Sequence, residues 1–189
     1  MSEEIKIIFE PLDFCRVKKI NEKGFGFLKS IYYPNDIFFH FSQIKKEDFL
    51  DKLNKMKRGD FLLYFTSKLL PDNKRKVDKL WYELKQVPVN LIQSFKIKIT
   101  TEFNTGTINV FDLLFVFNDL KMNGYISEED LIKILNSQKI KNLPTVILPY
   151  LDEEEFEILK KILDFDSISD LEVKPFWFDE FNKKEKNGI

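Results

Sequence analysis

The sequence predicts an α+β fold class, in which a β-rich N-terminal half precedes a mostly α-helical C-terminal half. The first half contains short runs in which aromatic residues alternate with small or polar ones, a pattern typical of strands. The second half contains longer apolar stretches that begin at helix-capping residues. Charge divides the chain at the same place: residues 1–88 carry 18 Lys and Arg against 13 Asp and Glu, and residues 89–189 carry 12 against 18. We therefore expect two domains with different partners.

Two aromatic runs stand out in the N-terminal half. They are Lys23–Leu28, with the sequence KGFGFL, and Asp36–Phe41, with the sequence DIFFHF. Between them, Tyr33-Pro34-Asn35 predicts a turn, because proline and asparagine favour turn conformations. The two runs are therefore expected to pair as antiparallel strands.

This pairing would bring four side chains together on one face of a sheet, namely Phe25, Phe27, Phe38 and His40. Aromatic rings on such a face, surrounded by lysines, stack against unpaired bases. The alternative is that the four side chains simply build a small core. Other apolar residues can fill the inside of the sheet, however: Val17, Leu28, Ile37, Phe39, Leu63 and Phe65. The pattern therefore favours a surface that binds single-stranded nucleic acid.

The two runs, in this order, also carry a family resemblance. KGFGFL is similar to the first ribonucleoprotein motif of the cold-shock domain, and DIFFHF followed by Ser42 is similar to the second. The spacing to Phe49 is that of the family, and Arg58-Gly59-Asp60 resembles the turn before its fourth strand. Residues from about Cys15 to Leu84 thus resemble a cold-shock domain. The resemblance implies a five-stranded antiparallel OB-type β-barrel that binds single-stranded RNA or DNA.

The pattern and the resemblance together give a set of expected nucleic-acid-binding residues. For stacking and base contacts these are Phe25, Phe27, Phe38, His40, Phe41 and Phe49. For contacts to phosphates they are Lys18, Lys19, Lys23, Lys74 and Arg75. Lys19 stands where the family usually has an aromatic residue, so we expect more salt dependence and less stacking at that position.

The expected domain layout follows from composition and from residues that interrupt regular secondary structure. An extended N-terminal extension covers residues 1–14, and the barrel covers residues 15–86. The short proline-containing stretch Val87–Asn90 marks the boundary to an acidic helical domain, residues 87–182. Residues 183–189 are expected to be a disordered tail.

Within the acidic domain, the alternation of Phe95–Thr100 predicts a strand. Helices are predicted over Val110–Met122 behind the cap Asn109, from the cap Ser127 to about Ser137, and from the cap Asp152 to Leu163. The aromatic tail Leu171–Phe181 is expected to pack onto these helices. The alternative is that this tail docks on a protein partner.

Two acidic clusters could in principle hold metal ions. The stretch Asp119–Asp130 partly fits a calcium loop, but Lys121 stands at a ligand position, and a helix-turn-helix connection explains the same letters. Asp164, Asp166 and Asp170 could hold magnesium for nucleic-acid cleavage. No histidine or other basic partner suited to catalysis accompanies these aspartates. The simpler interpretation is that they belong to an acidic helix end and loop. Cys15 and His40 are the single cysteine and histidine, which excludes a disulfide within the chain and a zinc site built from cysteines.

These observations predict a binding protein and not an enzyme, with no catalytic residue, metal or cofactor. We expect a cytoplasmic RNA chaperone or regulator that binds single-stranded nucleic acid, RNA being favoured over DNA, and no membrane. Residues 89–189 are expected to contact a protein partner. Two alternatives stay open: the acidic half could dock on the barrel and inhibit it, or the Asp164 region could form a metal-dependent nuclease.

Overall fold

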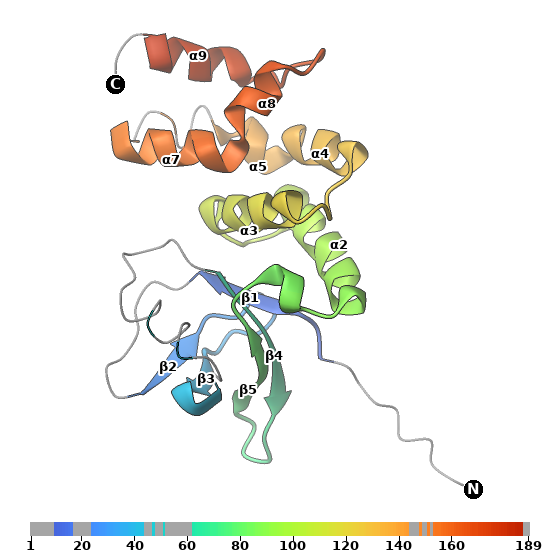
Figure 1. Cartoon of the computed structure of the whole chain (residues 1–189), viewed down its shortest axis with the longest axis vertical. Coiled ribbons are helices and arrows are strands. Elements are labelled where there is room, and N and C mark those ends of the chain that lie inside the picture. The colour runs from blue at the N-terminus through green and yellow to red at the C-terminus, as the bar shows by residue number, and fades with distance from the viewer. Residues whose placement is uncertain are drawn as a thin grey trace, which may run out of the picture. The chain divides into compact units, whose positions relative to one another are not determined.

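The computed structural model describes residues 10–16, 24–43, 47, 51, 62–143, 148, 151 and 153–186. The chain divides into two compact units, Met1–Phe95 and Lys96–Ile189. All strands of the described residues lie in the first unit, and the second unit is helical (Figure 1). The predicted α+β fold class is therefore confirmed.

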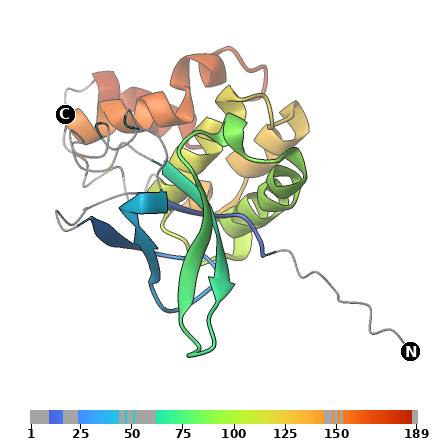
Figure 2. The same cartoon turned by 60° about the horizontal axis from the view of Figure 1, so that its bottom comes forward.

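The strands of the N-terminal unit form one five-stranded sheet in the order β1-β4-β5-β3-β2. The strands are β1 (Asp13–Arg16), β2 (Phe25–Leu28), β3 (Ile37–His40), β4 (Leu62–Leu69) and β5 (Arg75–Trp81). Neighbouring strands are antiparallel except β3 and β5, which are parallel and meet at Phe38 and Lys76. The sheet curls around its own core (Figure 2), so the OB-type architecture is confirmed, with one parallel pair that the sequence did not predict.

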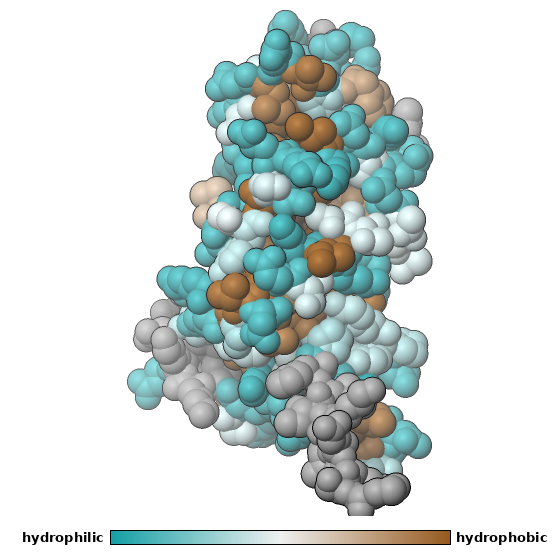
Figure 3. Space-filling view, turned by 90° about the vertical axis from the view of Figure 1, so that its right-hand side faces the viewer, coloured by the Kyte–Doolittle hydropathy of each residue, from teal (hydrophilic) through white to brown (hydrophobic). Residues whose placement is uncertain are grey.

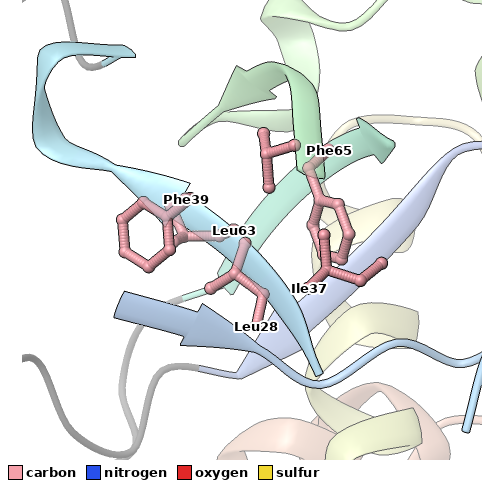
Figure 4. Packing of buried hydrophobic residues seen from close by; sticks show 6 residues of the cluster. Leu28, Ile37, Phe39, Leu63 and Phe65 are labelled. Atoms are coloured by element: carbon pink, nitrogen blue, oxygen red, sulfur yellow. The ribbon is translucent and has the colours of Figure 1, made fainter. Parts of the chain in front are cut away.

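The inside of the curled sheet is filled by six apolar side chains, each at most 2% exposed: Leu28, Ile37, Phe39, Leu63, Phe65 and Val77. They come from β2, β3, β4 and β5 and point toward one another (Figure 4). Five of the six predicted interior residues belong to this cluster, and the sixth, Val17, lies outside the described residues. The core is therefore complete without the rings on the outer side of β2 and β3.

One glycine makes the packing of this core possible. Gly26 pairs with Phe39 across β2 and β3. A Cβ atom on Gly26 would lie 2.4 Å from Cε1 of Phe39, closer than packed atoms approach. The phenyl ring of Phe39 therefore occupies the space that any other residue at position 26 would fill.

The β1–β4 pair is covered on its other side by the start of α2 (Val89–Thr105). Phe95 of this helix makes edge-to-face contacts with Phe14, at 5.9 Å between ring centroids, and with Tyr64, at 6.0 Å. Phe14 and Tyr64 are register partners in β1 and β4. The first turns of α2 thus belong to the N-terminal unit, and the division between the units falls inside this helix.

The prediction of a strand over Phe95–Thr100 is wrong, because these residues lie within α2. The buried apolar residues of the helix are Ile92, Phe95, Ile99 and Phe103, which recur every three or four positions. Over these six residues, lysines alternate with apolar side chains and imitate a strand, whereas the wider window has the helical period. The hydroxyl of Thr100 donates to the carbonyl of Lys96 at 3.0 Å, which satisfies the β-branched polar side chain inside the helix.

The other predicted helices of the C-terminal unit are present. The described helices are α3 (Val110–Met122), α4 (Glu128–Leu135), α5 (Gln138–Lys141), α7 (Glu153–Leu163), α8 (Phe165–Ser169) and α9 (Phe178–Lys186). Asn109 accepts a hydrogen bond from the Phe111 N–H at 2.9 Å and caps α3. Ser127 and Asp130 form a reciprocal capping box at the start of α4. Asp152, the predicted cap of the helix now labelled α7, lies outside the described residues.

The aromatic tail packs onto the helices, as predicted. Trp177 and Phe181 are fully buried, and the ring of Phe178 stacks on Phe165 at 4.7 Å between centroids. Disorder from Lys183 onward was also predicted, and this is wrong as far as Lys186, where α9 ends. The last turn of α9 is held by an ion pair between Glu185 and Lys160 and by Lys184, whose ammonium donates to the Leu151 carbonyl at 3.1 Å.

A search of the described helices finds none that combines the length and the apolar character needed to cross a bilayer.

Replacing Gly26 with alanine is expected to destabilise the N-terminal unit by about 1–3 kcal/mol, the usual penalty for an extra methyl group in a filled core. Urea unfolding monitored by circular dichroism measures this difference.

A second substitution separates crowding from other effects of alanine at position 26. Phe39→Leu shortens the side chain that meets the new methyl group, so Gly26→Ala should be less harmful in the Phe39→Leu background than in the wild type. Equal stability of Gly26→Ala and wild type would contradict the packing described here.

Candidate nucleic-acid interface

Four side chains share the outer face of β2 and β3, and we call them the aromatic platform: Phe25, Phe27, Phe38 and His40. The strand register sets Phe25 opposite His40 and Phe27 opposite Phe38. Phe27 is 59% exposed, His40 is exposed, and Phe25 and Phe38 are half-buried. The sequence prediction that these residues share one face is confirmed by the register.

The three phenyl rings form one contiguous surface. Ring centroids lie 6.0 Å apart for Phe25 and Phe38, 5.8 Å for Phe27 and Phe38, and 6.3 Å for Phe25 and Phe27. Two of these contacts are edge-to-face, which is a favourable geometry for aromatic pairs. A continuous apolar surface of this kind makes the platform a candidate binding surface, because a folded core gains nothing from leaving rings in water.

The imidazole of His40 is oriented by the turn that follows β3. The backbone N–H of Ser42 donates to Nδ1 at 3.1 Å, and the Ser42 hydroxyl lies 2.8 Å from the same nitrogen. Because Nδ1 accepts a hydrogen bond, the neutral ring carries its proton on Nε2. His40 therefore presents an N–H donor at the edge of the aromatic platform.

Gln43 fixes the end of β3 that carries His40. Its side-chain oxygen accepts the His40 N–H at 3.0 Å, and its amide nitrogen donates to the Val77 carbonyl at 2.8 Å. Gln43 belongs to the short helical turn η1 (Phe41–Gln43). One side chain thus bridges β3 and β5 beyond the point at which their backbones pair.

A buried carboxylate anchors the loop that joins β2 to β3. Asp13 is 2% exposed and accepts hydrogen bonds from the Ser30 hydroxyl and from the Ile31 N–H at 3.1 Å. The oxygen of Ser30 in turn accepts the backbone N–H groups of Tyr32 at 3.0 Å and Tyr33 at 3.1 Å. Burial raises the pKa of Asp13 to about 6, and the hydrogen bonds oppose part of this rise.

Arg75 is held in a second polar cluster beside the platform. Its Nη1 lies 3.1 Å from Oε2 of Glu10 and 3.3 Å from the Ser67 hydroxyl. The guanidinium also lies 3.5 Å from the centroid of the Tyr33 ring, and the Tyr33 hydroxyl donates to Glu10 at 2.8 Å. The phosphate contact of Arg75 stays a prediction, and in the structure its guanidinium contacts Glu10 and Tyr33.

The remaining predicted site residues fall into three groups. Lys74 is exposed and forms a 3.2 Å ion pair with Asp72, a surface pair that phosphate can displace. Phe41 packs against the core, with its ring 5.8 Å from that of Phe39, so the structure does not place it with the aromatic platform. The others lie outside the described residues: Lys18, Lys19, Lys23 and Phe49.

Sequence reasoning did not select Lys76, Asn35 and Asn73, which line a pocket beside Phe27 and Phe38. The predicted site contains Lys74 and Arg75 but not the next residue, Lys76. The register supplies the missing information, because Lys76 is the β5 partner of Phe38.

Members of both acidic clusters contact other residues of the protein. Asp164 pairs with Lys121 at 2.7 Å, and this hydrogen bond holds the pKa of Asp164 below its usual value. Asp130 takes part in the α4 cap and pairs with Lys96 at 3.0 Å. Across the described part of the chain, no three histidine, cysteine or acidic side chains gather in a way that could hold a metal ion. The stretch Asp119–Asp130 contains the end of α3 at Met122 and the start of α4 at Glu128, so it is a helix-turn-helix connection.

The comparison with protein families agrees with the geometry. Residues 15–68 match the model of the family described as 'Cold-shock' DNA-binding domain. The match contains both aromatic runs and ends within β4, before β5 begins. This segment is therefore similar to a cold-shock domain, which is a nucleic-acid-binding type of domain, and the match supports binding of single-stranded nucleic acid. No curated protein and no solved structure gives a significant match to the chain.

The pKa of Asp13 gives a pH-dependent prediction. Because the folded-state value of about 6 lies above the ordinary 3.8, the contribution of this group to the free energy of unfolding is largest below about pH 4 and is lost as pH rises through 6. Asn imitates the protonated acid, so Asp13→Asn should gain stability relative to wild type between pH 4 and pH 8, by about 2–3 kcal/mol. Urea unfolding at several pH values measures this change.

The exposed Asp36 of the same loop provides the matched control, since Asp36→Asn also removes one negative charge. Parallel stability curves for wild type and Asp13→Asn would contradict the assigned role of the buried carboxylate.

Proposed function

We propose that this protein binds single-stranded nucleic acid, with RNA as its target, and acts as an RNA chaperone or regulator by holding strands unpaired. The observation that carries the proposal is the aromatic platform. Its three phenyl rings form a continuous, partly exposed surface on strands whose inner faces already fill the core.

Stacking supplies the main attraction in this proposal. Each base that stacks on an aromatic side chain contributes about 1–3 kcal/mol, and stacking tolerates any base because every base has a flat face. Phe25 and Phe38 provide adjacent surfaces for consecutive bases, and the Nε2–H of His40 can donate to a base edge. Binding should therefore depend weakly on sequence.

Phosphate contacts supply the second attraction. Residues 1–88 carry the positive excess of the chain, with 18 Lys and Arg against 13 Asp and Glu. Lys74 and Lys76 stand on the β5 side of the platform, next to Phe38. Each lysine that neutralises a phosphate releases counterions, so the affinity should fall as salt rises.

For the C-terminal unit we propose contact with a protein partner. Apolar patches interrupt the hydrophilic surface of its helices (Figure 3). Val173 is 84% exposed and Phe176 is 58% exposed, although the neighbouring Trp177 is fully buried. Exposed apolar residues beside a tightly packed aromatic cluster are typical of contact surfaces.

The double substitution Phe25→Ala/Phe38→Ala is expected to weaken binding of a fluorescent uridine strand by an order of magnitude or more, because two stacking surfaces disappear. Fluorescence anisotropy at several salt concentrations measures the affinity. The slope of affinity against salt should stay the same, because the phosphate contacts are unchanged. A thymidine strand of equal length, measured alongside, tests the preference for RNA.

A pair of equally exposed rings provides the control. Phe27 is 59% exposed on the platform, and Phe176 is 58% exposed in the C-terminal unit. Phe27→Ala should weaken binding by about 5- to 150-fold, and Phe176→Ala should leave it unchanged. Equal affinities of all these variants would exclude the platform as the binding surface.

The proposed role of the C-terminal unit predicts the opposite pattern. Val173→Asp/Phe176→Asp should leave strand affinity unchanged and should remove proteins that co-purify with the tagged wild-type chain from its native cells. Phe25→Ala/Phe38→Ala should retain those proteins after nuclease treatment. An identical set of co-purifying proteins for the wild type and the aspartate variant would contradict the proposal.

A further inference from the structure

A pocket of ≈ 420 Å³ opens at one end of the aromatic platform, and we call it the flank pocket. It lies between the loop that joins β2 to β3 and the turn of the β4–β5 hairpin. Phe27 and Phe38 line it and also belong to the platform, so the two sites are continuous. Asn35 lines it from the β2–β3 loop, and Asn73, Lys74 and Lys76 line it from the hairpin.

The loop that forms one wall is fixed by contacts already described. Tyr33 lies under the guanidinium of Arg75 and is hydrogen-bonded to Glu10, and the backbone before it is anchored on Ser30 and the buried Asp13. These contacts join the loop to β1 and to β5. A wall that is already ordered loses little conformational entropy when a ligand binds.

The opposite wall is a closed turn. The Leu70 N–H donates to the Lys74 carbonyl at 2.8 Å, and the Asn73 N–H donates to the Leu70 carbonyl at 3.0 Å. Asn73 takes a left-handed backbone conformation with φ of 62°, which asparagine tolerates better than most residues. The turn therefore fixes the backbone positions of Asn73 and Lys74, which both line the pocket.

The chemistry of the walls matches that of a nucleotide. Phe27 and Phe38 offer apolar ring surface, Asn35 and Asn73 offer amide groups that both donate and accept hydrogen bonds, and two lysines offer positive charge. Among the lining residues, Asp36 supplies one negative charge, whereas Lys74, Lys76 and Arg75 supply positive charges. A volume of ≈ 420 Å³ falls in the range of small-ligand sites.

We propose that the flank pocket holds one nucleotide of the bound strand, adjacent to the bases stacked on the aromatic platform. Its base lies against Phe27 and Phe38 within reach of the two asparagine amides. Lys74 and Lys76 neutralise the phosphates on either side of it. The proposal rests on the proposed function and adds to it a subsite at which a base edge meets hydrogen-bonding groups.

This subsite sets a path for the strand. Bases leave the platform at Phe27 and Phe38 and continue toward the β4–β5 hairpin. The site is one nucleotide longer than the platform, and the pocketed base is the one at which sequence preference arises, since hydrogen bonds to base edges discriminate and stacking does not.

Salt dependence tests the phosphate contacts. The full chain and Lys74→Gln/Lys76→Gln are titrated with a fluorescent oligothymidine at several salt concentrations. Because a single strand loses about 0.7 from its salt slope for each phosphate contact removed, the slope of the variant should fall by about 1.4. An unchanged slope overturns the assignment of these lysines to phosphates.

The same hairpin supplies a matched control, Lys68→Gln/Lys79→Gln. Each pair contains one lysine in a surface ion pair, Lys74 with Asp72 at 3.2 Å and Lys68 with Asp78 at 3.0 Å. Each double substitution removes two charges from β4, β5 or their turn, but Lys68 and Lys79 do not line the pocket. The control should keep most of the wild-type salt slope. An equal loss of slope in both variants would mean that the lysines act only through general electrostatic attraction, and this would overturn the proposal.

Strand length tests the subsite itself. In a series of oligothymidines that differ by one nucleotide, affinity should rise with each step until platform and pocket are filled. Lys74→Gln/Lys76→Gln should lose the last step, while the control keeps it. Free thymidine monophosphate, titrated by calorimetry, should bind far more weakly than the strands; tight binding of it that depends on these lysines, with strand affinity unaffected, would assign the pocket to a free nucleotide and overturn the proposal.

Failure of this inference is distinct from failure of the proposed function. If Phe25→Ala/Phe38→Ala weakens strand binding but the two lysine variants behave alike, binding at the platform is supported and the subsite in the flank pocket is overturned. If no strand binds the wild-type chain, both proposals are overturned.

Discussion

The contact between Gly26 and Phe39 is the constraint on which the rest of the N-terminal unit depends. The ring of Phe39 fills the space beside Gly26, where a Cβ atom would approach it to 2.4 Å. This contact sets which face of β2 and of β3 turns inward, because shifting either strand by one residue would move every side chain to the other face. Leu28 and Ile37 then enter the core, and Phe25, Phe27, Phe38 and His40 can only face outward. The outward position of the aromatic platform is thus a consequence of how the core is packed.

The polar clusters around this sheet have a supporting role that the aromatic motifs alone do not suggest. Asp13 and Ser30 tie the β2–β3 loop to β1, and Arg75 and Glu10 clamp Tyr33 of the same loop. Gln43 holds the other end of β3 against β5. These contacts fix both ends of the platform strands without adding bulk to the exposed face. Preorganisation of this kind favours binding of a flexible strand to a flat surface, because only the ligand then loses conformational entropy on binding.

Much of the fold could be predicted from the sequence where local signals and packing agree. The strand alternation, the α3 cap at Asn109 and the α4 cap at Ser127 are local, and each is found where predicted. Prediction failed where a local pattern opposed its wider context. The alternating stretch Phe95–Thr100 lies in a helix, and the charged residues Lys183–Lys186 belong to α9. For the site, the platform rings were predictable because their period is 2. The role of Arg75, the inward position of Phe41 and the flank pocket were not, because they depend on contacts among segments far apart in the sequence.

The central claim is that unpaired bases stack on Phe25, Phe27, Phe38 and His40. It is tested most directly by nuclear magnetic resonance of the full chain with labelled phenylalanine and histidine rings, during titration with a uridine strand. The rings of these four residues should show large shifts, because a stacked base changes the ring-current field at close range, while the buried ring of Phe39 should shift little. Large shifts confined to rings of the C-terminal unit, with the platform unaffected, would contradict the account.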